Sequence, residues 1–381
     1  MKGIKKYAWV FDALSHVGIA TKTRVLKHFM GGEKKYMIKG KKGDIDAIIK
    51  CSLCPNMCKF DCPTFNASNN ETLSPAGKAR LAYIFEKGEY DESIVKAIYE
   101  CCSCDACKEW CFFDYSLADL LRGVRQDVVE EKAVPDEIAE IASNLTERKT
   151  MGERRLKERE GKILYFAGCT VQDEATGIAK AMMKIFESIK EDYAMLGEEW
   201  CCGYPLYNLG FIKEFKKFAK HNADVFKKYS MIVCSCPTCT YVFKQIYPDM
   251  GFKINAVIMH STEYLAKMMK EGKINVENLA MDAVYHDPCK LARRLKIIEE
   301  PRYLLQYTVN LKEPYFSREA TRCCGRGGQL AKIDESISKK IAEQRKEELK
   351  SVATEIVTAC PSCKIALNAY DIAEIVAMGL K

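Results

Sequence analysis

The second half of the chain carries one arrangement of cysteines twice. Each copy has a single cysteine, then an adjacent pair followed by glycine, then a Cys-Pro-x-Cys motif. The first copy consists of Cys169, Cys201, Cys202, Cys236 and Cys239, and the second of Cys289, Cys323, Cys324, Cys360 and Cys363. The three motifs are separated by 31 and 33 residues in the first copy and by 33 and 35 residues in the second. Three motifs repeated in one order at nearly equal spacing indicate a duplicated unit.

Short apolar runs alternate with helical periodicity in both copies, which is typical of an α/β layer. The expected strands are residues 162–167, 231–233, 283–285 and 355–357, and the expected helices are residues 178–189, 211–226, 291–307 and 333–349. Earlier in the chain, residues 72–99 are predicted to form a helix that Ser74 caps, with Pro75 in its first turn. The predicted fold class is therefore α/β with an all-α N-terminal part.

Two compact runs of four cysteines precede the duplicated unit. They are Cys51, Cys54, Cys58 and Cys62, and then Cys101, Cys104, Cys107 and Cys111. The second run has the spacing of bacterial ferredoxins, except that Phe112 stands where proline is usual. In two-cluster ferredoxins the fourth cysteine binds the other cluster. On that logic Cys51, Cys54, Cys58 and Cys111 hold one [4Fe-4S] cluster, and Cys101, Cys104, Cys107 and Cys62 hold the other.

Zinc and disulfides are the alternative explanations of these cysteines. Paired Cys-x2-Cys motifs also form zinc sites, but such pairs are normally a dozen or more residues apart, whereas these runs are compact. The first run also has one extra residue between Cys54 and Cys58, which leaves its loop geometry open. A chain of 381 residues that is 48% hydrophobic is too long and too apolar for a disulfide-stapled miniprotein, although it contains 20 cysteines. Metal ligation by free thiols in a reducing, cytoplasmic location is therefore favoured.

Positive charge is concentrated at the start of the chain. Residues 1–50 hold 12 Lys plus Arg against 4 Asp plus Glu, whereas the net charge of the whole chain is +7. Such a segment can bind the cytoplasmic face of a membrane or an acidic partner subunit, or it can simply be a solvated surface. No zinc-finger spacing or helix-turn-helix signal accompanies the charge, so nucleic acid is not an expected partner.

The cysteine pattern resembles the duplicated CCG domain of heterodisulfide reductases. The layout of two ferredoxin-type motifs followed by two CCG domains is similar to the D subunit of that enzyme, and to the iron–sulfur subunits of anaerobic glycerol-3-phosphate dehydrogenase, glycolate oxidase and D-lactate dehydrogenases. The likeness extends to the segments at residues 74–80, 286–289 and 323–328. The resemblance covers the chain from about residue 45 onward, and the basic first 45 residues lie outside it.

The resemblance implies a noncubane [4Fe-4S] cluster in each CCG domain. Its ligands in the first are Cys169, Cys201, Cys202, Cys236 and Cys239, and in the second Cys289, Cys323, Cys324, Cys360 and Cys363. In heterodisulfide reductases such centres split a disulfide one electron at a time, so the second set and His286 are candidate catalytic residues. In the dehydrogenase relatives the same layout relays electrons from a flavin subunit towards quinone. The expected partners are accordingly a flavoprotein dehydrogenase subunit or a membrane b-type cytochrome, with a small thiol or disulfide as substrate.

Several residues beside the cysteines have two interpretations. His286 can donate a proton to a departing thiolate, or it can close the ligand turn by hydrogen bonding. Four arginines near the second set can attract an anionic substrate or raise a cluster potential, or they can be ordinary surface residues; they are Arg293, Arg294, Arg322 and Arg326. Cys102 and Cys234 are left over from the ligand sets and are expected to be buried small residues.

The predicted organisation has five parts: a basic segment (1–45), a helical 4Fe-4S ferredoxin-type domain (46–127), a linker helix (128–161) and two CCG domains (162–280 and 281–381).

No flavin or NAD site is expected, because the Gly325 segment lacks the third glycine of a dinucleotide fingerprint. A chain with only one-electron centres needs a partner for hydride chemistry. The function predicted is an iron–sulfur subunit of an anaerobic oxidoreductase complex; a zinc-stabilised, non-redox scaffold is the alternative from another class.

Overall fold

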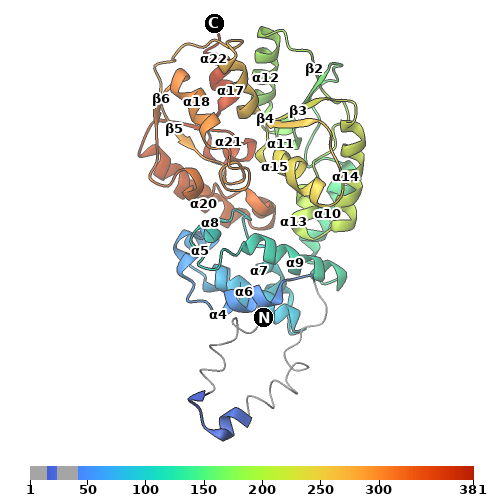
Figure 1. The fold of residues 1–381 in the computed structure, drawn as a ribbon, viewed down its shortest axis with the longest axis vertical. Helices are drawn as coiled ribbons and strands as arrows, with labels where there is room; N and C mark the ends of the chain where they lie inside the picture. Colours follow the sequence, from blue (N-terminus) through green and yellow to red (C-terminus); the bar gives the residue numbers. More distant parts are fainter. Residues whose placement is uncertain (1–14, 24–41) are drawn as a thin grey trace. The chain divides into compact units, whose positions relative to one another are not determined.

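The computed structural model describes residues 15–23 and 42–381 (Figure 1). Residues 1–41 form one unit and residues 42–381 a second, larger one. In the first unit, residues 19–23 are helical. The basic N-terminal segment predicted for residues 1–45 lies largely outside the described residues. No helix among the described residues is long and apolar enough to cross a membrane.

Residues 42–148 form a helical part. It contains α4 (Ile45–Leu53), α5 (Pro63–Ser68), α6 (Pro75–Glu86), α7 (Glu92–Tyr99), α8 (Ala106–Glu109), α9 (Leu117–Glu130) and α10 (Asp136–Arg148), with 3₁₀ helices at Met57–Asp61 and Glu71–Leu73. Apolar side chains of α6, α7 and α9 pack together in its core, among them Phe85, Ile98 and Leu121. The helical character predicted for the first part of the chain is confirmed.

The helix predicted over residues 72–99 begins as expected but is divided in two. The Ser74 hydroxyl accepts a hydrogen bond from the Gly77 N–H at 3.1 Å, and Pro75 occupies the first turn of α6. The chain then turns at Gly88, whose φ of 81° lies in the left-handed region that favours glycine. Helix α7 starts afresh at a second cap, where Asp91 accepts from the Ile94 N–H. Gly88 followed by the cap at Asp91 is a local signal for this break, so the prediction of a single helix was wrong.

Residues 128–161 are not a single linker helix. Helix α9 ends at Glu130, Pro135 precedes α10, and α10 ends at Arg148. Helix α10 also has a buried face, because Ile138, Ala142 and Leu145 pack into the cores on either side of it. The charged residues of this stretch therefore cover the outside of a packed helix.

The first repeat is a four-stranded parallel sheet with the order β2-β1-β3-β4. Its strands are β1 (Ile163–Phe166), β2 (Tyr193–Ala194), β3 (Met231–Cys234) and β4 (Val257–His260). Its helices are α11 (Cys169–Asp173), α12 (Thr176–Ser188), α13 (Tyr204–Leu209), α14 (Ile212–Phe226), α15 (Pro237–Tyr241), α16 (Tyr247–Asp249) and α17 (Ser261–Lys270), with a π-helical turn at Val242–Ile246.

The second repeat has the same topology, with a parallel sheet in the order β6-β5-β7-β8. Its strands are β5 (Asp282–His286), β6 (Asn310–Lys312), β7 (Glu355–Thr358) and β8 (Tyr370–Asp371). Its helices are α18 (Glu299–Thr308), α19 (Leu330–Ile333), α20 (Glu335–Lys350), α21 (Pro361–Leu367) and α22 (Ile372–Met378), with a π-helical turn at Lys290–Arg294 and 3₁₀ turns at Arg318–Ala320 and Gly327–Gln329. The α/β layer predicted for the second half is confirmed.

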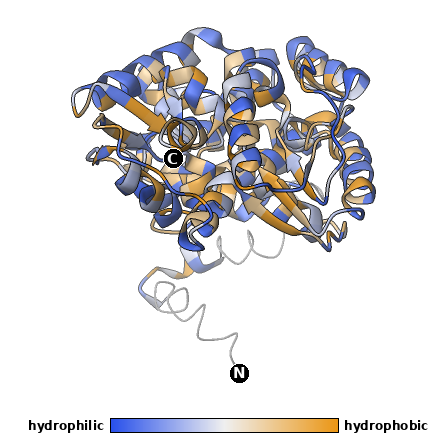
Figure 2. Ribbon diagram, turned by 90° about the horizontal axis from the view of Figure 1, so that it is seen from above, coloured by the Kyte–Doolittle hydropathy of each residue, from blue (hydrophilic) through white to orange (hydrophobic). Residues whose placement is uncertain are grey.

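The two sheets share one apolar core. Helix α12 of the first repeat packs against α22 of the second, and α17 packs against α18. Ile178 and Met182 lie in the same buried cluster as Ile372 and Val376. Figure 2 shows the apolar strands inside each repeat and hydrophilic residues on the outward turns of the surrounding helices. The repeats are therefore one rigid block rather than two loosely linked domains.

The duplication extends to the helix caps. His260 caps α17 and Asp371 caps α22, and both form a capping box with a glutamate three residues later. Asp371 is buried, and burial raises its pKa to about 7. The Asp371 carboxyl group thus binds its proton more tightly in the folded protein than in the unfolded chain.

A dependence of stability on pH follows. The contribution of Asp371 is present below its ordinary pKa of 3.8 and is lost as pH rises through about 7. Asp371→Asn keeps an oxygen for the Ala373 N–H and is expected to flatten this dependence. Urea unfolding of both proteins at about pH 5 and about pH 8 measures it. The control is Asp249→Asn, because Asp249 is exposed. If the free energy of unfolding differs between the two pH values by as much in Asp371→Asn as in this control, the assignment is contradicted.

Candidate metal centres

The cysteines of each repeat follow the carboxyl ends of its central strands. Cys169 comes three residues after β1 and Cys236 two residues after β3, and Cys289 and Cys360 have the same places after β5 and β7. Strands of a parallel sheet end at one edge, so the loops that follow them meet there. Pro237 and Pro361 then start the short helices that carry the last cysteine of each set.

The cysteine pair of each repeat lies on a tight turn that ends at a left-handed glycine. Gly203 and Gly325 have φ values of 79° and 89°. The backbone N–H of each glycine donates to the sulfur of the first cysteine in the pair, to Cys201 Sγ and Cys323 Sγ, at 3.4 Å in both cases. Backbone donors aimed at sulfur stabilise the thiolate form that metals require.

The five cysteines of the first repeat form a continuous series of sulfur contacts. Cys201 contacts Cys169 and Cys202, and Cys239 contacts Cys202 and Cys236. Hydrogen bonds from Cys201 and Cys239 lower the pKa of Cys202 to about 6. The Cys169 turn is fixed from behind by the buried Glu199 carboxylate, which accepts from the backbone N–H groups of Ala167 and Gly168.

The second set is arranged in the same way. Cys363 Sγ donates to Cys324 Sγ at 3.3 Å, and Cys323 contacts Cys289 and Cys324. Hydrogen bonds from Cys323 and Cys363 lower the pKa of Cys324 well below its ordinary value. The structure thus brings together the five predicted ligands within each repeat.

Both sets line the same cavity. Its volume is about 250 Å³, and all ten repeat cysteines contribute to its wall. Lys290, Arg326 and Lys332 provide positive charge in the wall, and Asp173 and Glu174 provide negative charge. Arg326 pairs with Glu174 at 2.9 Å and so joins the second repeat to the first. The duplicated cysteines therefore face one shared space.

The cysteines of the helical part form two mixed groups. Cys51 has Cys58, Cys111 and Cys54 as its charged neighbours, and burial together with these thiols raises its pKa to about 12. Cys107 has Cys62, Cys104, Cys101 and Cys58 as thiol neighbours, and burial raises its pKa well above the ordinary value. Cys111 thus lies with the first run, and Cys62 interacts with Cys107 of the second run as well as with Cys58 of the first.

These groups suit iron–sulfur centres chemically. Buried thiols that raise one another's pKa can exist as thiolates only beside a positive ion, and soft thiolate sets select zinc or iron–sulfur clusters. The Ser103 N–H also approaches Cys101 Sγ at 3.5 Å, as expected of a loop that wraps a cluster. Cys62 and Cys104 are buried, and Cys101 and Cys107 are partly buried. A metal bound in this group would therefore be coordinated by protein sulfur rather than by water.

His286 lies against the second set. A ligand atom of His286 lies within 4.8 Å of the sulfurs of Cys324 and Cys363. Arg345 Nε donates to His286 Nδ1 at 3.3 Å, and a guanidinium can only donate, so the ring proton is assigned to Nε2. Burial lowers the pKa of His286, and its ring also hydrogen bonds with Cys324. His286 therefore contacts a sulfur of the cavity wall as a neutral ring.

The four arginines near the second set of cysteines have different environments in the structure. Arg326 lines the cavity, and Arg322 stacks on Phe316. Arg293 is buried and Arg294 largely so, and both donate to the helical part, so neither is an ordinary surface residue. Lys290 is also buried and lines the cavity. In the sequence, only its position directly after Cys289 marks it.

The two leftover cysteines differ from each other. Both are buried, as expected. Cys234 is the last residue of β3 and pairs in register with His260. Cys102 lines the cavity and contacts the Cys323 thiol, so it belongs to the site although no motif requires it.

Comparisons with known proteins bear on these sites. The family model of the CCG cysteine-rich domain matches residues 163–244 and 283–368. The D subunit of the dihydromethanophenazine:CoB--CoM heterodisulfide reductase of Methanosarcina acetivorans is 27% identical, over 84% of this chain and 88% of its own length. The EtfAB:quinone oxidoreductase of Syntrophomonas wolfei is 26% identical over 84% of this chain and 54% of its own. The B subunit of the fumarate reductase (CoM/CoB) of Methanothermobacter marburgensis is 23% identical over 82% and 66%. All three relatives are named as oxidoreductases or their subunits.

Proposed function

We propose that this chain, which carries two CCG domains and is similar to the D subunit of heterodisulfide reductase, is the iron–sulfur subunit of an anaerobic oxidoreductase complex that reduces or forms a disulfide. The observation that carries this proposal is the shared cavity. All ten repeat cysteines line it, and clusters held by these cysteines would occupy much of its volume of about 250 Å³. The cationic side chains Lys290, Arg326 and Lys332 in the same wall favour an anionic sulfur substrate beside the clusters over an electron relay without one.

The proposed cofactors are two [4Fe-4S] cubanes and two noncubane [4Fe-4S] clusters. The cubane ligands are Cys51, Cys54, Cys58 and Cys111 for one, and Cys62, Cys101, Cys104 and Cys107 for the other. The five cysteines of each repeat hold the noncubane clusters. When bound, such groups accept and release single electrons at potentials that hydrogen bonds and burial adjust. The close thiol neighbours and backbone donors described above support this assignment.

The surroundings of the cavity suit an anionic sulfur compound. Reduction of a disulfide to two thiols consumes two electrons and two protons. Lys290 and Arg326 lie where a developing thiolate or an acidic substituent can be neutralised. The His286 Nε2–H hydrogen bonds with Cys324 and orients this sulfur in the cavity wall. The electrons come from a partner subunit through the helical part.

The apolar surface of the helical part indicates where such a partner binds. Large exposed apolar side chains border the group of Cys51, Cys54, Cys58 and Cys111; they are Leu53, Met57, Phe60, Trp110, Phe112 and Phe113. Phe112, which replaces the usual proline, is 96% exposed. Patches of this kind on a soluble surface mark protein contacts. A flavoprotein dehydrogenase subunit or a b-type cytochrome is the partner proposed.

The second candidate function is an electron relay from a flavoprotein to quinone. It is favoured by the similarity to the EtfAB:quinone oxidoreductase, which is as extensive on this chain as the similarity to heterodisulfide reductase. In that case the cavity cysteines hold redox centres without a substrate. Iron and sulfide content also tests the zinc-stabilised scaffold.

The test is metal analysis and electron paramagnetic resonance on anaerobically purified protein. We expect about 16 iron atoms per chain and a new paramagnetic species that appears only with a thiol and an oxidant. High iron with no response to thiol would favour the relay. About 8 iron atoms with bound zinc would refute the CCG clusters, and zinc alone would support the scaffold.

A further inference from the structure

One loop of the helical part lies directly against the second repeat. Cys323 contacts its own neighbours Cys289 and Cys324 and, across the interface, Cys102 and Cys104. Cys102 Sγ also approaches the Gly325 carbonyl at 3.9 Å. Cys104 belongs to the group formed with Cys62, Cys101 and Cys107. Sulfurs from two different groups therefore touch at this place.

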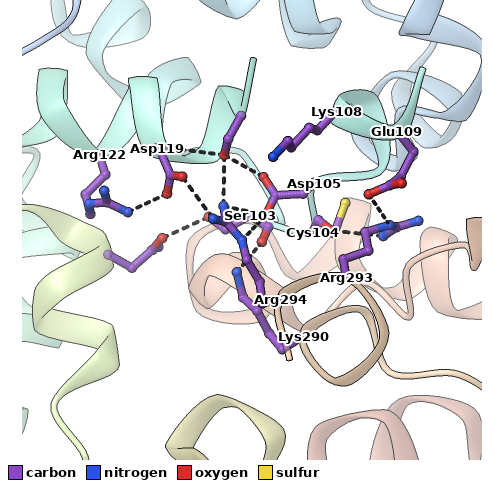
Figure 3. Close-up of polar contacts among 12 residues, drawn as sticks. Ser103, Cys104, Asp105, Lys108, Glu109, Asp119, Arg122, Lys290, Arg293 and Arg294 are labelled. Carbon is purple, nitrogen blue, oxygen red and sulfur yellow. Dashed lines mark hydrogen bonds and ion pairs between the residues drawn. The ribbon is translucent and has the colours of Figure 1, made fainter. Parts of the chain in front are cut away.

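Three cations in the turn after Cys289 hold this loop, one for each successive residue (Figure 3). Lys290 Nζ donates to the Ser103 carbonyl at 2.8 Å, and Arg293 Nη1 donates to the Cys104 carbonyl at 2.9 Å. Arg294 Nε donates to the Asp105 carboxylate at 2.5 Å. Three consecutive residues are thus fixed by a single turn of the second repeat.

The contacts are buried and further anchored. The side chain of Arg293 is 1% exposed and that of Asp105 is 2% exposed. Arg293 also donates to the carbonyls of Glu319 and Thr321, and Arg294 to Ser116 and Asp119. Charge-assisted hydrogen bonds of this kind are short and directional. They therefore fix both the position and the orientation of the loop against the second repeat.

The first repeat lacks these cations at the matching positions. Counting from Cys169 and Cys289, the counterparts of Lys290, Arg293 and Arg294 are Thr170, Asp173 and Glu174. Asp173 pairs with Arg155, and Glu174 with Arg326. The first repeat reaches the same loop through Asn208 of α13, which accepts from the Ser103 hydroxyl. Its contact is made by a helix and not by the turn that carries a cysteine.

Glycines provide a second, independent difference between the repeats. A Cβ atom on Gly327 would lie 2.2 Å from the Cys102 carbonyl oxygen, and one on Gly328 would lie 2.0 Å from that of Cys101. Their counterparts after the first cysteine pair are Pro205 and Leu206. Only the second repeat is shaped for backbone contact with the Cys101–Cys102 loop.

We propose that Lys290, Arg293 and Arg294 are positioning residues that hold Cys104 against Cys323 and so make the second repeat, not the first, the one that exchanges electrons with the helical part. The inference rests on the proposed function, since it requires redox groups on these cysteines. With iron–sulfur groups bound, one electron would pass from the group held by Cys104 to the group held by Cys323. A reduced one-electron carrier on the partner subunit would supply this electron.

The test combines electron paramagnetic resonance with rapid-mixing kinetics on the full chain, with dithionite as reductant. The variant carries Arg293→Gln and Arg294→Gln, and the control is Arg122→Gln, which pairs with Asp119 and stacks on Tyr207 of the first repeat. The signal of the second repeat is identified by its loss in Cys324→Ala. We expect the double variant to keep its iron, to lose the magnetic interaction between the two adjoining centres, and to reduce the second repeat at least about tenfold more slowly.

Other outcomes separate this inference from the function on which it rests. If the double variant keeps its full iron, its magnetic interaction and its reduction rate, the positioning role is overturned. Reduction of the first repeat before the second in the unsubstituted protein overturns it as well. Arg293→Lys with Arg294→Lys is expected to restore part of the rate. If the double variant loses iron, Lys290→Met must show the same slower reduction at full iron, or the proposal fails. An unsubstituted protein without iron refutes the proposed function itself.

Discussion

Replacing Cys324 by alanine is expected to remove about a quarter of the bound iron and the thiol-dependent paramagnetic signal, and to lower the proposed disulfide reductase activity at least about 100-fold. Cys324 contacts Cys323, Cys363 and His286, so its loss opens the second set at its centre. Removal of a residue that contacts a metal ligand typically lowers metal affinity or activity about 10- to 100-fold. Removal of the ligand itself is expected to lower them at least as much. Iron analysis, spectra and activity on one anaerobic preparation measure the three effects.

The matched control is Cys234→Ala. Cys234 is equally buried, but it lies on β3 and does not line the cavity. It is expected to keep its full iron content and its response to thiol. Equal iron in Cys324→Ala and the unsubstituted protein would show that Cys324 binds no metal. Equal losses in both variants would indicate general damage rather than loss of a ligand.

The second large effect is expected at Arg302, and it concerns stability. Arg302 makes a bidentate pair with Asp287, with both N–O distances at 2.8 Å, and the side chains are 7% and 1% exposed. Arg302→Met leaves the Asp287 carboxylate buried without its cation, which typically costs about 3–5 kcal/mol. Asp287 lies two residues before Cys289 and also accepts from the Arg318 N–H. Loss of the pair therefore weakens the ligand turn together with the fold.

Anaerobic thermal unfolding measures this cost, and a fall in Tm of about 4–7 °C is expected. Arg318→Met is the control, because Arg318 pairs through its side chain with Glu299 on the surface and contacts Asp287 only through its backbone. An exposed pair contributes about 0–1 kcal/mol, so this control should unfold within about 2 °C of the unsubstituted protein. Equal Tm values for both variants would contradict the importance of the buried pair.

The central strands could be predicted from the sequence, but the edge strands could not. β1, β3, β5 and β7 are buried on both faces and therefore read as short apolar runs, such as residues 231–233. β2 and β8 have only two residues each and take their strand character from pairing with a neighbour. The helix boundary at Ser74 follows from local capping, and the break at Gly88 also has a local signal, in that glycine and the cap at Asp91.

The site could be predicted in its residues but not in its arrangement. Cysteine spacing is local information, so the two sets of five and the two runs of four are visible in the chain. The common cavity depends on how α12 packs against α22, which no local pattern encodes. Lys290 and Arg293 look like surface residues because their partners are backbone carbonyls of residues almost 190 positions earlier. Cys102 likewise gains its place from an interface.

The unlike turns after Cys169 and Cys289 bear on how a protein of this kind can arise. Two identical subunits around a common cavity would each have to carry the same turn, so Lys-Leu-Ala-Arg-Arg and Thr-Val-Gln-Asp-Glu could not both be present. Tandem fusion releases the copies from that symmetry. In the second copy the turn after the first cysteine binds the helical part, whereas the first copy contacts the helical part through α13. The cavity wall is unlike on its two sides, with Asp173 and Glu174 from the first repeat and Lys290 and Arg326 from the second, so the two halves of a disulfide of the proposed kind would meet different surroundings.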